Sequence, residues 1–241
     1  MAALPIEAGI MSGAAVGSKV YLFGGKSSNG ALDAIHVFDA ETNTVTTLST
    51  IMSTKTYGMA VAAVGEKVYL FGGQSSSANS GYLGTIHVFD SKTETLTKLS
   101  ATFAATSDMA AVAIGNNIYL FGGKTSTTWS PYIRVFNTES NTIYSISTNL
   151  QIEAGGMAAA AVGTKVYLFG GKNTSGHQKT IQVFDAETHT TTTLSTTIPT
   201  GMKDIAAVAI GAKVYLFGGY DGGIRKNAIY AFDTETKRSP H

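Results

Sequence analysis

Cysteine is absent from this chain of 241 residues, tryptophan occurs once and proline four times. The lack of cysteine excludes disulfides, thiolate metal sites and cysteine nucleophiles together. An excess of one charge is also lacking, because 17 basic and 16 acidic residues are scattered along the chain and leave a net charge of +1. A nucleic-acid partner is therefore not expected.

Long apolar runs are missing as well. No run approaches the roughly 18 residues that a membrane helix needs. The N-terminal segment lacks the basic start of a signal peptide and is interrupted by Pro5 and Glu7. We expect no membrane insertion and a soluble protein that is either cytoplasmic or a fragment of a larger one. The sequence does not fix the compartment.

What the chain does have is a repeat. The string YLFGG occurs five times at spacings of 48, 50, 48 and 48 residues, starting at Tyr21, Tyr69, Tyr119, Tyr167 and Tyr215. An Ala-rich segment precedes each copy, and a segment such as IHVFD follows it, ending at Asp39, Asp90, Asn137, Asp185 or Asp233. The first four copies then have a Thr-rich run. Each piece is short, bounded by turn residues and mostly β-branched or aromatic, which predicts four strands, A to D, in each repeat.

The small side chains of strand A predict its position. A run such as Met157-Ala158-Ala159-Ala160-Ala161-Val162 has the low bulk expected where sheets converge on an axis. Alanine also favours helix, but a segment this short between glycines is too short for a stable helix. Sheets of this size must stack to bury both faces. We therefore predict an all-β, five-bladed β-propeller with four antiparallel strands per blade, a single domain over residues 1–241. The predicted blades span approximately 6–50, 51–100, 101–149, 150–197 and 198–241.

The turns are predicted from the same copies. Gly-x-Lys, first at Gly17, suits a tight primed hairpin between strands A and B. The Asp or Asn that ends strand C is expected to bond the backbone two residues on, at the C-D turn.

This pattern resembles kelch repeats, a propeller family in which strand B ends in Gly-Gly, a tyrosine precedes the glycines and the next strand ends in Asp. The sequence departs from that family in two ways. The tryptophan usual in strand D is replaced at Val45, Leu96, Ile143, Thr191 and Ser239. After Asp233 no Thr-rich segment follows, so the last blade is expected to lack its outer strand.

The two ends of each blade are expected to differ. At the A-B and C-D turns, Lys19, Lys67, Lys165 and Lys213 alternate with Glu41, Glu139, Glu187 and Glu235, which predicts a solvated ring of weak ion pairs. The B-C and D-A loops differ from copy to copy, and loops on a rigid scaffold often carry binding residues. The candidate partner-binding residues are Trp129, Tyr132, Tyr57, Lys55, Tyr82, Asp108, Lys203, Asp204, Tyr220, Asp221 and Arg225. Trp129 is either an anchor for a partner or a packing plug over the blade edge.

Catalytic motifs are absent from the sequence. His36 and His87 occupy one repeat position that Arg134, Gln182 and Tyr230 fill elsewhere, which favours a semi-exposed packing site over a metal ligand. We expect no catalytic residues, no metal and no cofactor. Kelch-type copper oxidases need a cysteine, whereas kelch-type sialic acid mutarotases need only acid-base groups and an arginine, for which Arg225 is available.

Three functions stay open at this stage. The first is a kelch-like scaffold that binds a protein or peptide through the B-C and D-A loops. The second is a carbohydrate-binding or sialic-acid-mutarotase-like propeller, suggested by Trp129, the tyrosines and the polar loops. The third is a structural array unit of a larger surface protein that self-associates through the incomplete fifth blade.

Overall fold

The computed structural model describes residues 2–75 and 81–238, and every regular element in them is a β-strand. The chain divides into two compact units. The first comprises Met1–Ser107, Thr125–Thr127 and Asn137–Ile143, and the second comprises Asp108–Lys124, Thr128–Phe136 and Tyr144–His241. A search of the described residues for a helix with the length and apolarity of a membrane span finds none.

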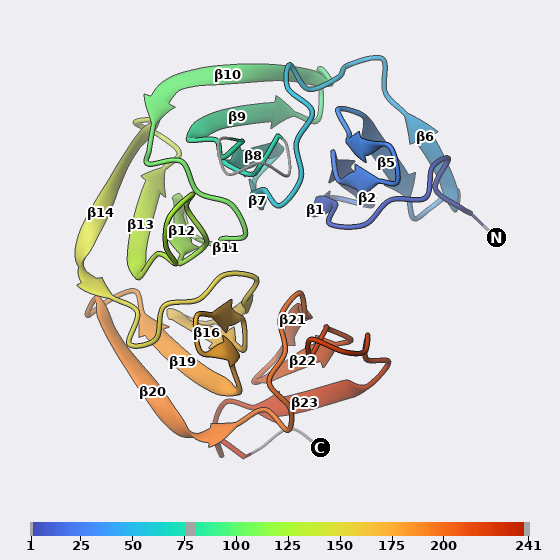
Figure 1. Ribbon diagram of the computed structural model, residues 1–241. Helices are drawn as coiled ribbons and strands as arrows, with labels where there is room; N and C mark the ends of the chain where they lie inside the picture. Colours follow the sequence, from blue (N-terminus) through green and yellow to red (C-terminus); the bar gives the residue numbers. More distant parts are fainter. Residues whose placement is uncertain (1, 76–80, 239–241) are drawn as a thin grey trace. The chain divides into compact units, whose positions relative to one another are not determined.

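The first unit contains two four-stranded antiparallel sheets, ordered β1-β2-β5-β6 and β7-β8-β9-β10 (Figure 1). A short hairpin of two strands, β3 and β4, lies in the first B-C loop. The strands are β1 (Ser12–Val16), β2 (Lys19–Phe23), β3 (Lys26–Ser27), β4 (Gly30–Ala31), β5 (Ile35–Asp39), β6 (Thr44–Thr47), β7 (Ala60–Val64), β8 (Lys67–Phe71), β9 (Thr85–Asp90) and β10 (Thr95–Thr102).

The other sheets lie mainly in the second unit and are ordered β11-β12-β13-β14, β15-β16-β19-β20 and β21-β22-β23, with the hairpin β17-β18 in the fourth B-C loop (Figure 1). Their strands are β11 (Ala110–Ile114), β12 (Asn117–Phe121), β13 (Tyr132–Asn137), β14 (Thr142–Asn149), β15 (Ala158–Val162), β16 (Lys165–Phe169), β17 (Lys172–Asn173), β18 (Gly176–His177), β19 (Thr180–Asp185), β20 (Thr190–Thr197), β21 (Ala206–Ile210), β22 (Lys213–Phe217) and β23 (Ile229–Asp233).

These sheets confirm the predicted all-β, five-bladed β-propeller. The fifth sheet has three strands among the described residues, as the sequence predicts. Ser239, the expected strand-D position of that blade, lies outside the described residues. That residues 1–241 form one domain stays a prediction.

The Ala-rich segments are extended, as predicted for strand A, and pack on one another within each unit. Within the first unit β1 packs against β7, and within the second unit β15 packs against both β11 and β21. Ala158 and Ala160 are buried in such a contact. Small side chains at these positions let neighbouring sheets approach closely.

Aromatic side chains of strands B and C join successive blades. Phe184 at the end of β19 packs on Tyr119 and Phe121 of the preceding blade, with ring centroids 5.4 Å apart in both pairs. Phe232 packs in the same way on Tyr167 and Phe169. Tilted and edge-to-face pairs of this kind stabilise by about 0.5–1.5 kcal/mol beyond their burial. Aromatic packing between these blades therefore comes from strands B and C, without a strand-D tryptophan.

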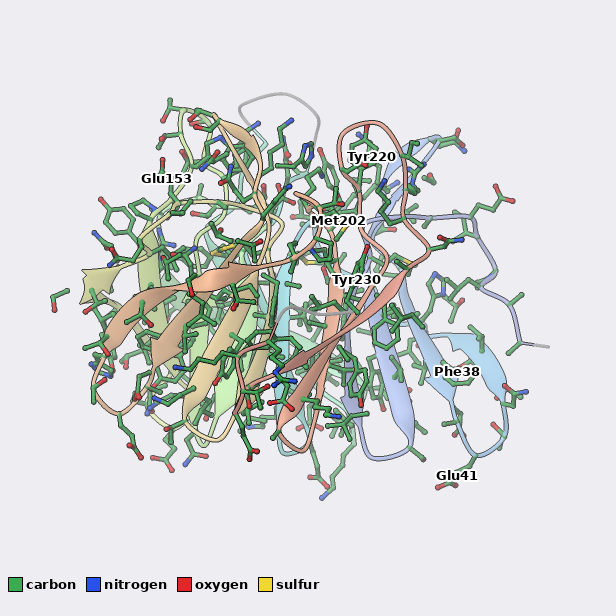
Figure 2. All side chains as sticks on the ribbon, turned by 90° about the horizontal axis from the view of Figure 1, so that it is seen from below. Phe38, Glu41, Glu153, Met202, Tyr220 and Tyr230 are labelled. Atoms are coloured by element: carbon green, nitrogen blue, oxygen red, sulfur yellow. The ribbon has the colours of Figure 1, made fainter. Side chains whose placement is uncertain are left out.

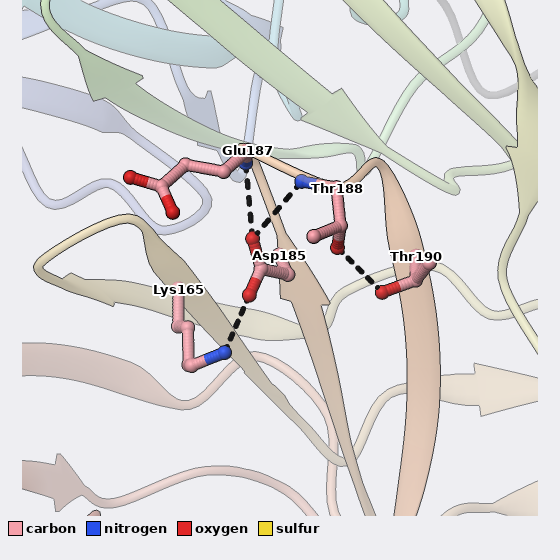
Figure 3. Close-up of polar contacts among 5 residues, drawn as sticks. All are labelled: Lys165, Asp185, Glu187, Thr188 and Thr190. Atoms are coloured by element: carbon pink, nitrogen blue, oxygen red, sulfur yellow. Dashed lines mark hydrogen bonds and ion pairs between the residues drawn. The ribbon is translucent and has the colours of Figure 1, made fainter.

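The turns also match the predictions. Gly163 begins a two-residue A-B turn with a φ of 60°, which suits the first central position of a type II′ hairpin. At the C-D turn, one carboxylate oxygen of Asp185 accepts hydrogen bonds from the backbone N–H groups of Glu187 and Thr188, at 3.0 and 3.2 Å (Figure 3). Asp39, Asp90, Asn137 and Asp233 make the equivalent bonds.

Candidate binding surface

Each blade carries a second, smaller ladder at the end where the B-C and D-A loops lie. Its central residue is the one after Gly-Gly. This residue bridges a residue later in its own B-C loop and, in four blades, a residue of the segment before strand A. We call these the cap ladders. They comprise Gly9-Lys26-Ala31, Tyr57-Gln74-Tyr82, Lys124-Trp129, Gly155-Lys172-His177 and Lys203-Tyr220-Arg225. Only Tyr220 of these central residues is among the candidate residues named from the sequence, although the repeated Gly-Gly marks all five positions.

In the first unit, Gln74 brings two predicted residues together. Its backbone exchanges hydrogen bonds of 3.1 and 2.8 Å with Tyr57 and also bridges Tyr82. The Tyr57 side chain is 9% exposed and has the Lys26 ammonium 5.0 Å from its ring centre. Tyr57 is therefore mainly a packing residue, whereas Tyr82 is half-buried and Lys55 is exposed. Residues 76–80 of this B-C loop lie outside the described residues.

The third blade separates Trp129 from Tyr132. Trp129 is half-buried, has the Lys124 ammonium 5.5 Å from its ring centre and covers Gly155, where a Cβ atom would lie 2.8 Å from the indole. Contrary to the prediction, Tyr132 does not lie in the loop but is the first residue of β13. It is 49% exposed, and its ring centre lies 5.7 Å from the guanidinium carbon of Arg134. These contacts support the packing interpretation of Trp129. Its role as an anchor for a partner stays a prediction.

The fifth cap ladder gathers more predicted residues than any other. Lys203, Tyr220 and Arg225 are joined by backbone bridges, and Lys203 forms an ion pair with its neighbour Asp204. The Tyr220 ring meets His177 of the fourth ladder edge-on, with centroids 5.8 Å apart. His177, which looks like a lone loop histidine in the sequence, therefore belongs to this surface. Tyr220 and Glu153 lie at the same end of the second unit (Figure 2).

Charges around this ladder are mostly paired. The Asp221 carboxylate accepts the Lys226 ammonium at 2.5 Å and the backbone N–H groups of Ile224 and Gly223. The Lys226 ammonium and then these amides hold the pKa of Asp221 well below its usual range. Arg225 is exposed and forms no ion pair with any residue in ranges 2–75 and 81–238.

Residues with left-handed backbone in the D-A loops connect successive cap ladders. Within the second unit, the Gly156 N–H donates to the Asp108 carbonyl at 2.8 Å and the Asp204 N–H donates to the Gly156 carbonyl at 2.9 Å. Asp108 and Asp204 both have a φ of 55°, a region in which Asp is tolerated and Gly is favoured. These two predicted residues therefore shape the backbone of the surface as well as carrying charge on it.

The opposite end of the blades corrects one sequence-based expectation. The Lys165 ammonium pairs with Asp185, the residue opposite it in the sheet, at 2.5 Å, and not with Glu187 of the turn (Figure 3). The other ion pair described at these turns joins Lys92 to Glu66. Glu41, at the first C-D turn, points away from the blade (Figure 2). The expected ion pair with a turn glutamate is therefore wrong for Lys165.

The variable position in strand C is a packing position. His36 is 3% exposed, buried more deeply than the semi-exposed position predicted, with Nδ1 2.8 Å from the Thr47 hydroxyl. Gln182, 1% exposed, donates to the carbonyl and accepts from the N–H of Ile152, which ties strand C to the preceding D-A loop. Among the residues that the structure describes, no three His, Asp or Glu side chains gather as metal ligands would.

Comparison with known proteins gives a family. The profile of the KLHDC2/KLHL20/DRC7 Kelch-repeats domain matches residues 10–155 and 108–240, which together span nearly the whole chain. No individual curated protein matches. Kelch propellers generally act as protein-interaction scaffolds and typically are not enzymes. This match, with which the five sheets agree, shows that the chain belongs to the kelch-repeat family.

Proposed function

We propose that this kelch propeller binds a peptide segment of a protein partner through its cap ladders. The observation that supports this is that backbone bridges hold the loops in one repeated geometry while the bridged side chains differ from blade to blade. A fixed backbone lowers the entropy lost on binding. Different side chains on each ladder give a surface that distinguishes one partner from another.

The fifth ladder supplies the most specific chemistry in the second unit. Asp204 and Asp221 are neutralised by their lysine partners, so the exposed Arg225 dominates the local potential. An arginine fork favours a carboxylate, which it binds by two parallel hydrogen bonds. A peptide with at least one Asp or Glu side chain is therefore the expected ligand, with Tyr220 next to the contact.

Selection from a displayed peptide library tests this proposal. Selected peptides should carry an acidic residue, and Arg225→Glu should weaken their binding by at least about tenfold, because it replaces attraction by repulsion. Lys213→Glu is the matched control: it makes the same charge change in the same blade, at the exposed A-B turn. Equal binding by both variants would place the site elsewhere on the molecule.

A sugar acid is the second candidate ligand. Arg225 lies beside an aromatic ring, Tyr220, in one ladder, a combination that suits a carboxylated sugar as well as a peptide. A glycan array and NMR measurement of sialic acid mutarotation separate the two cases. Binding or turnover that Arg225→Glu abolishes would favour the sugar, and silence in both assays would remove it.

A further inference from the structure

The dipeptide Asn29-Gly30 lies at the tip of the first B-C loop, and it is the one place in the chain where glycine follows asparagine. Strands β3 and β4 pair Ser27 with Gly30, so Ser28 and Asn29 form the turn between them. Both turn residues are exposed. Asn-Gly is a strong turn signal, and it also places a side-chain amide next to the backbone nitrogen of a glycine.

The side chain of Asn29 is not held in place by hydrogen bonds. Its backbone N–H donates to the Ser27 hydroxyl at 3.1 Å, but its side-chain amide has no hydrogen-bond partner within residues 2–75 and 81–238. Asn173 is the opposite case. It is 8% exposed, and its amide donates to the Glu153 carbonyl at 3.1 Å and accepts from Gln178 at 2.8 Å. The amide of Asn29 can therefore rotate toward the next backbone nitrogen, whereas that of Asn173 cannot.

Gly30 offers a backbone nitrogen with little steric hindrance. Its φ is 112°, a conformation that glycine adopts without strain. A Cβ on this residue would meet nothing within 4 Å. Asn43 and Asn141 are also exposed turn residues, but each is followed by a threonine, whose branched Cβ crowds the backbone. Asn29 thus combines an exposed amide with the least hindered neighbour.

We propose that Asn29 is a site of spontaneous deamidation in the folded chain. The Gly30 nitrogen attacks the side-chain carbonyl carbon of Asn29 and forms a new C–N bond. The bond from that carbon to the amide nitrogen breaks, and ammonia leaves with the proton of the Gly30 nitrogen. The cyclic succinimide then takes up one water, and opening at either carbonyl gives aspartate or isoaspartate. Both reacting atoms belong to one turn of the first unit.

The fourth blade contains the same hairpin without the reactive amide. Strands β17 and β18 pair Asn173 with Gly176, whose φ is 109° and whose Cβ would likewise meet open space. The residue before that glycine is Ser175, which is exposed as Asn29 is. A serine hydroxyl has no carbonyl carbon for the glycine nitrogen to attack. The two hairpins are therefore a matched pair within one chain.

Asp221-Gly222 in the fifth B-C loop could form the same ring by losing water, but its side chain is held. The Asp221 carboxylate accepts two backbone N–H groups and pairs with the Lys226 ammonium. Ring closure needs the uncharged acid, and these contacts lower the pKa of Asp221. We therefore expect Asp221 to persist under conditions in which Asn29 reacts.

Conversion of Asn29 changes both the charge and the backbone of the first hairpin. The net formal charge falls by one, from +1 to 0, because a carboxylate replaces a neutral amide. Isoaspartate also carries the backbone through the former side chain, which lengthens a two-residue turn and should disrupt the pairing of Ser27 with Gly30. The first cap ladder uses the same hairpin through Lys26 and Ala31. Deamidation should therefore alter this ladder and leave the other four unchanged.

Peptide mapping by mass spectrometry tests the proposal after the folded chain has been incubated in mildly alkaline buffer. The peptide with Asn29 should acquire the mass of an amide-to-acid exchange before any peptide with another asparagine, and isoelectric focusing should show a matching acidic species. Asn29→Ser copies the fourth hairpin and should lose this product completely. Ser175→Asn should gain a second site, because it places the same dipeptide in the same geometry.

Incubation in urea separates the effect of the turn from that of the dipeptide. Circular dichroism verifies that the chain is folded in buffer and unfolded in urea, and Asn29 should convert in both samples. Conversion in urea with none in the folded chain would overturn the proposal, because the hairpin would then hold the reacting atoms apart. Faster conversion at another asparagine of the folded chain, or no reaction in Ser175→Asn, would overturn it as well.

Discussion

The two ends of each blade hold the connections between strands in different ways. At the turn end, the repeat fixes both the backbone and the side chain that stabilises it: Asp185 and its four equivalents bond the same two amides. At the cap end, the repeat fixes only the backbone, and the side chains on the bridged residues differ. The fold therefore depends on side-chain identity at one end of the blade and on backbone alone at the other.

The largest effect is expected from a pair of glycine substitutions that compares the two ends. Gly163 and Gly170 have nearly the same φ, 60° and 65°. A Cβ on Gly163 would meet open space at the turn end. Gly163→Ala should therefore lose only the stability that a left-handed alanine costs, about 1–2 kcal/mol. Gly170→Ala should cost more, because its Cβ would lie 2.4 Å from the Met202 carbonyl of the docked D-A loop. Urea unfolding of both variants measures the difference, and equal losses would contradict close docking of the loop.

A second pair separates the turn's amide bonds from its ion pair. Asp185→Ala removes the carboxylate that accepts two backbone N–H bonds and pairs with Lys165, with an expected loss of about 1 kcal/mol. Asp185→Asn should lose much less, because Asn137 makes the same two bonds, at 3.1 and 2.9 Å, in the third blade. Thermal unfolding ranks the two variants. If asparagine is as damaging as alanine, the ion pair carries the stability and the amide bonds do not.

The strand-C histidines predict that the stability of the fold depends on pH near neutrality. Burial lowers the pKa of His36 and His87 from the ordinary value of 6.5, and Lys98 adds to the effect at His87. Below pH 6.5 these histidines therefore bind protons more readily in the unfolded chain than in the folded one. The free energy of unfolding that is present above pH 6.5 is lost as the pH drops through the folded pKa values. Nε2 of each histidine is buried without a hydrogen-bond partner in the described residues.

Melting temperatures at several pH values between 7.5 and 5 measure this loss. His87→Gln should flatten part of the decline, because glutamine already occupies the equivalent position at Gln182. A decline of unchanged slope in that variant would assign the pH dependence to other groups.

Much of the scaffold was predictable because the repeat samples the same geometry five times. Tyr-Leu-Phe-Gly-Gly fixes strand B and its end, and the Asp that closes strand C fixes the turn. The cap ladders were not predictable in the same way. Their bridges are backbone to backbone, so Gln74, Lys124 and Tyr220 share a role without sharing any side-chain chemistry. For the same reason the sequence placed Trp129 and Tyr132 together, although one covers Gly155 and the other begins a strand.

The smallest stability effect is expected at the side chains of the cap ladders themselves. Arg225→Ala and Lys203→Ala should each change the free energy of unfolding by less than about 0.5 kcal/mol, because the bridges from Tyr220 use the backbone of both residues. Chemical denaturation of the two variants, with Asp185→Ala as the turn-end reference, measures this. A loss above that of the reference would show that these side chains hold the ladder. If the loss is negligible, side chains at the cap end vary at little cost to the fold, which is the freedom that a surface needs in order to specialise for a partner.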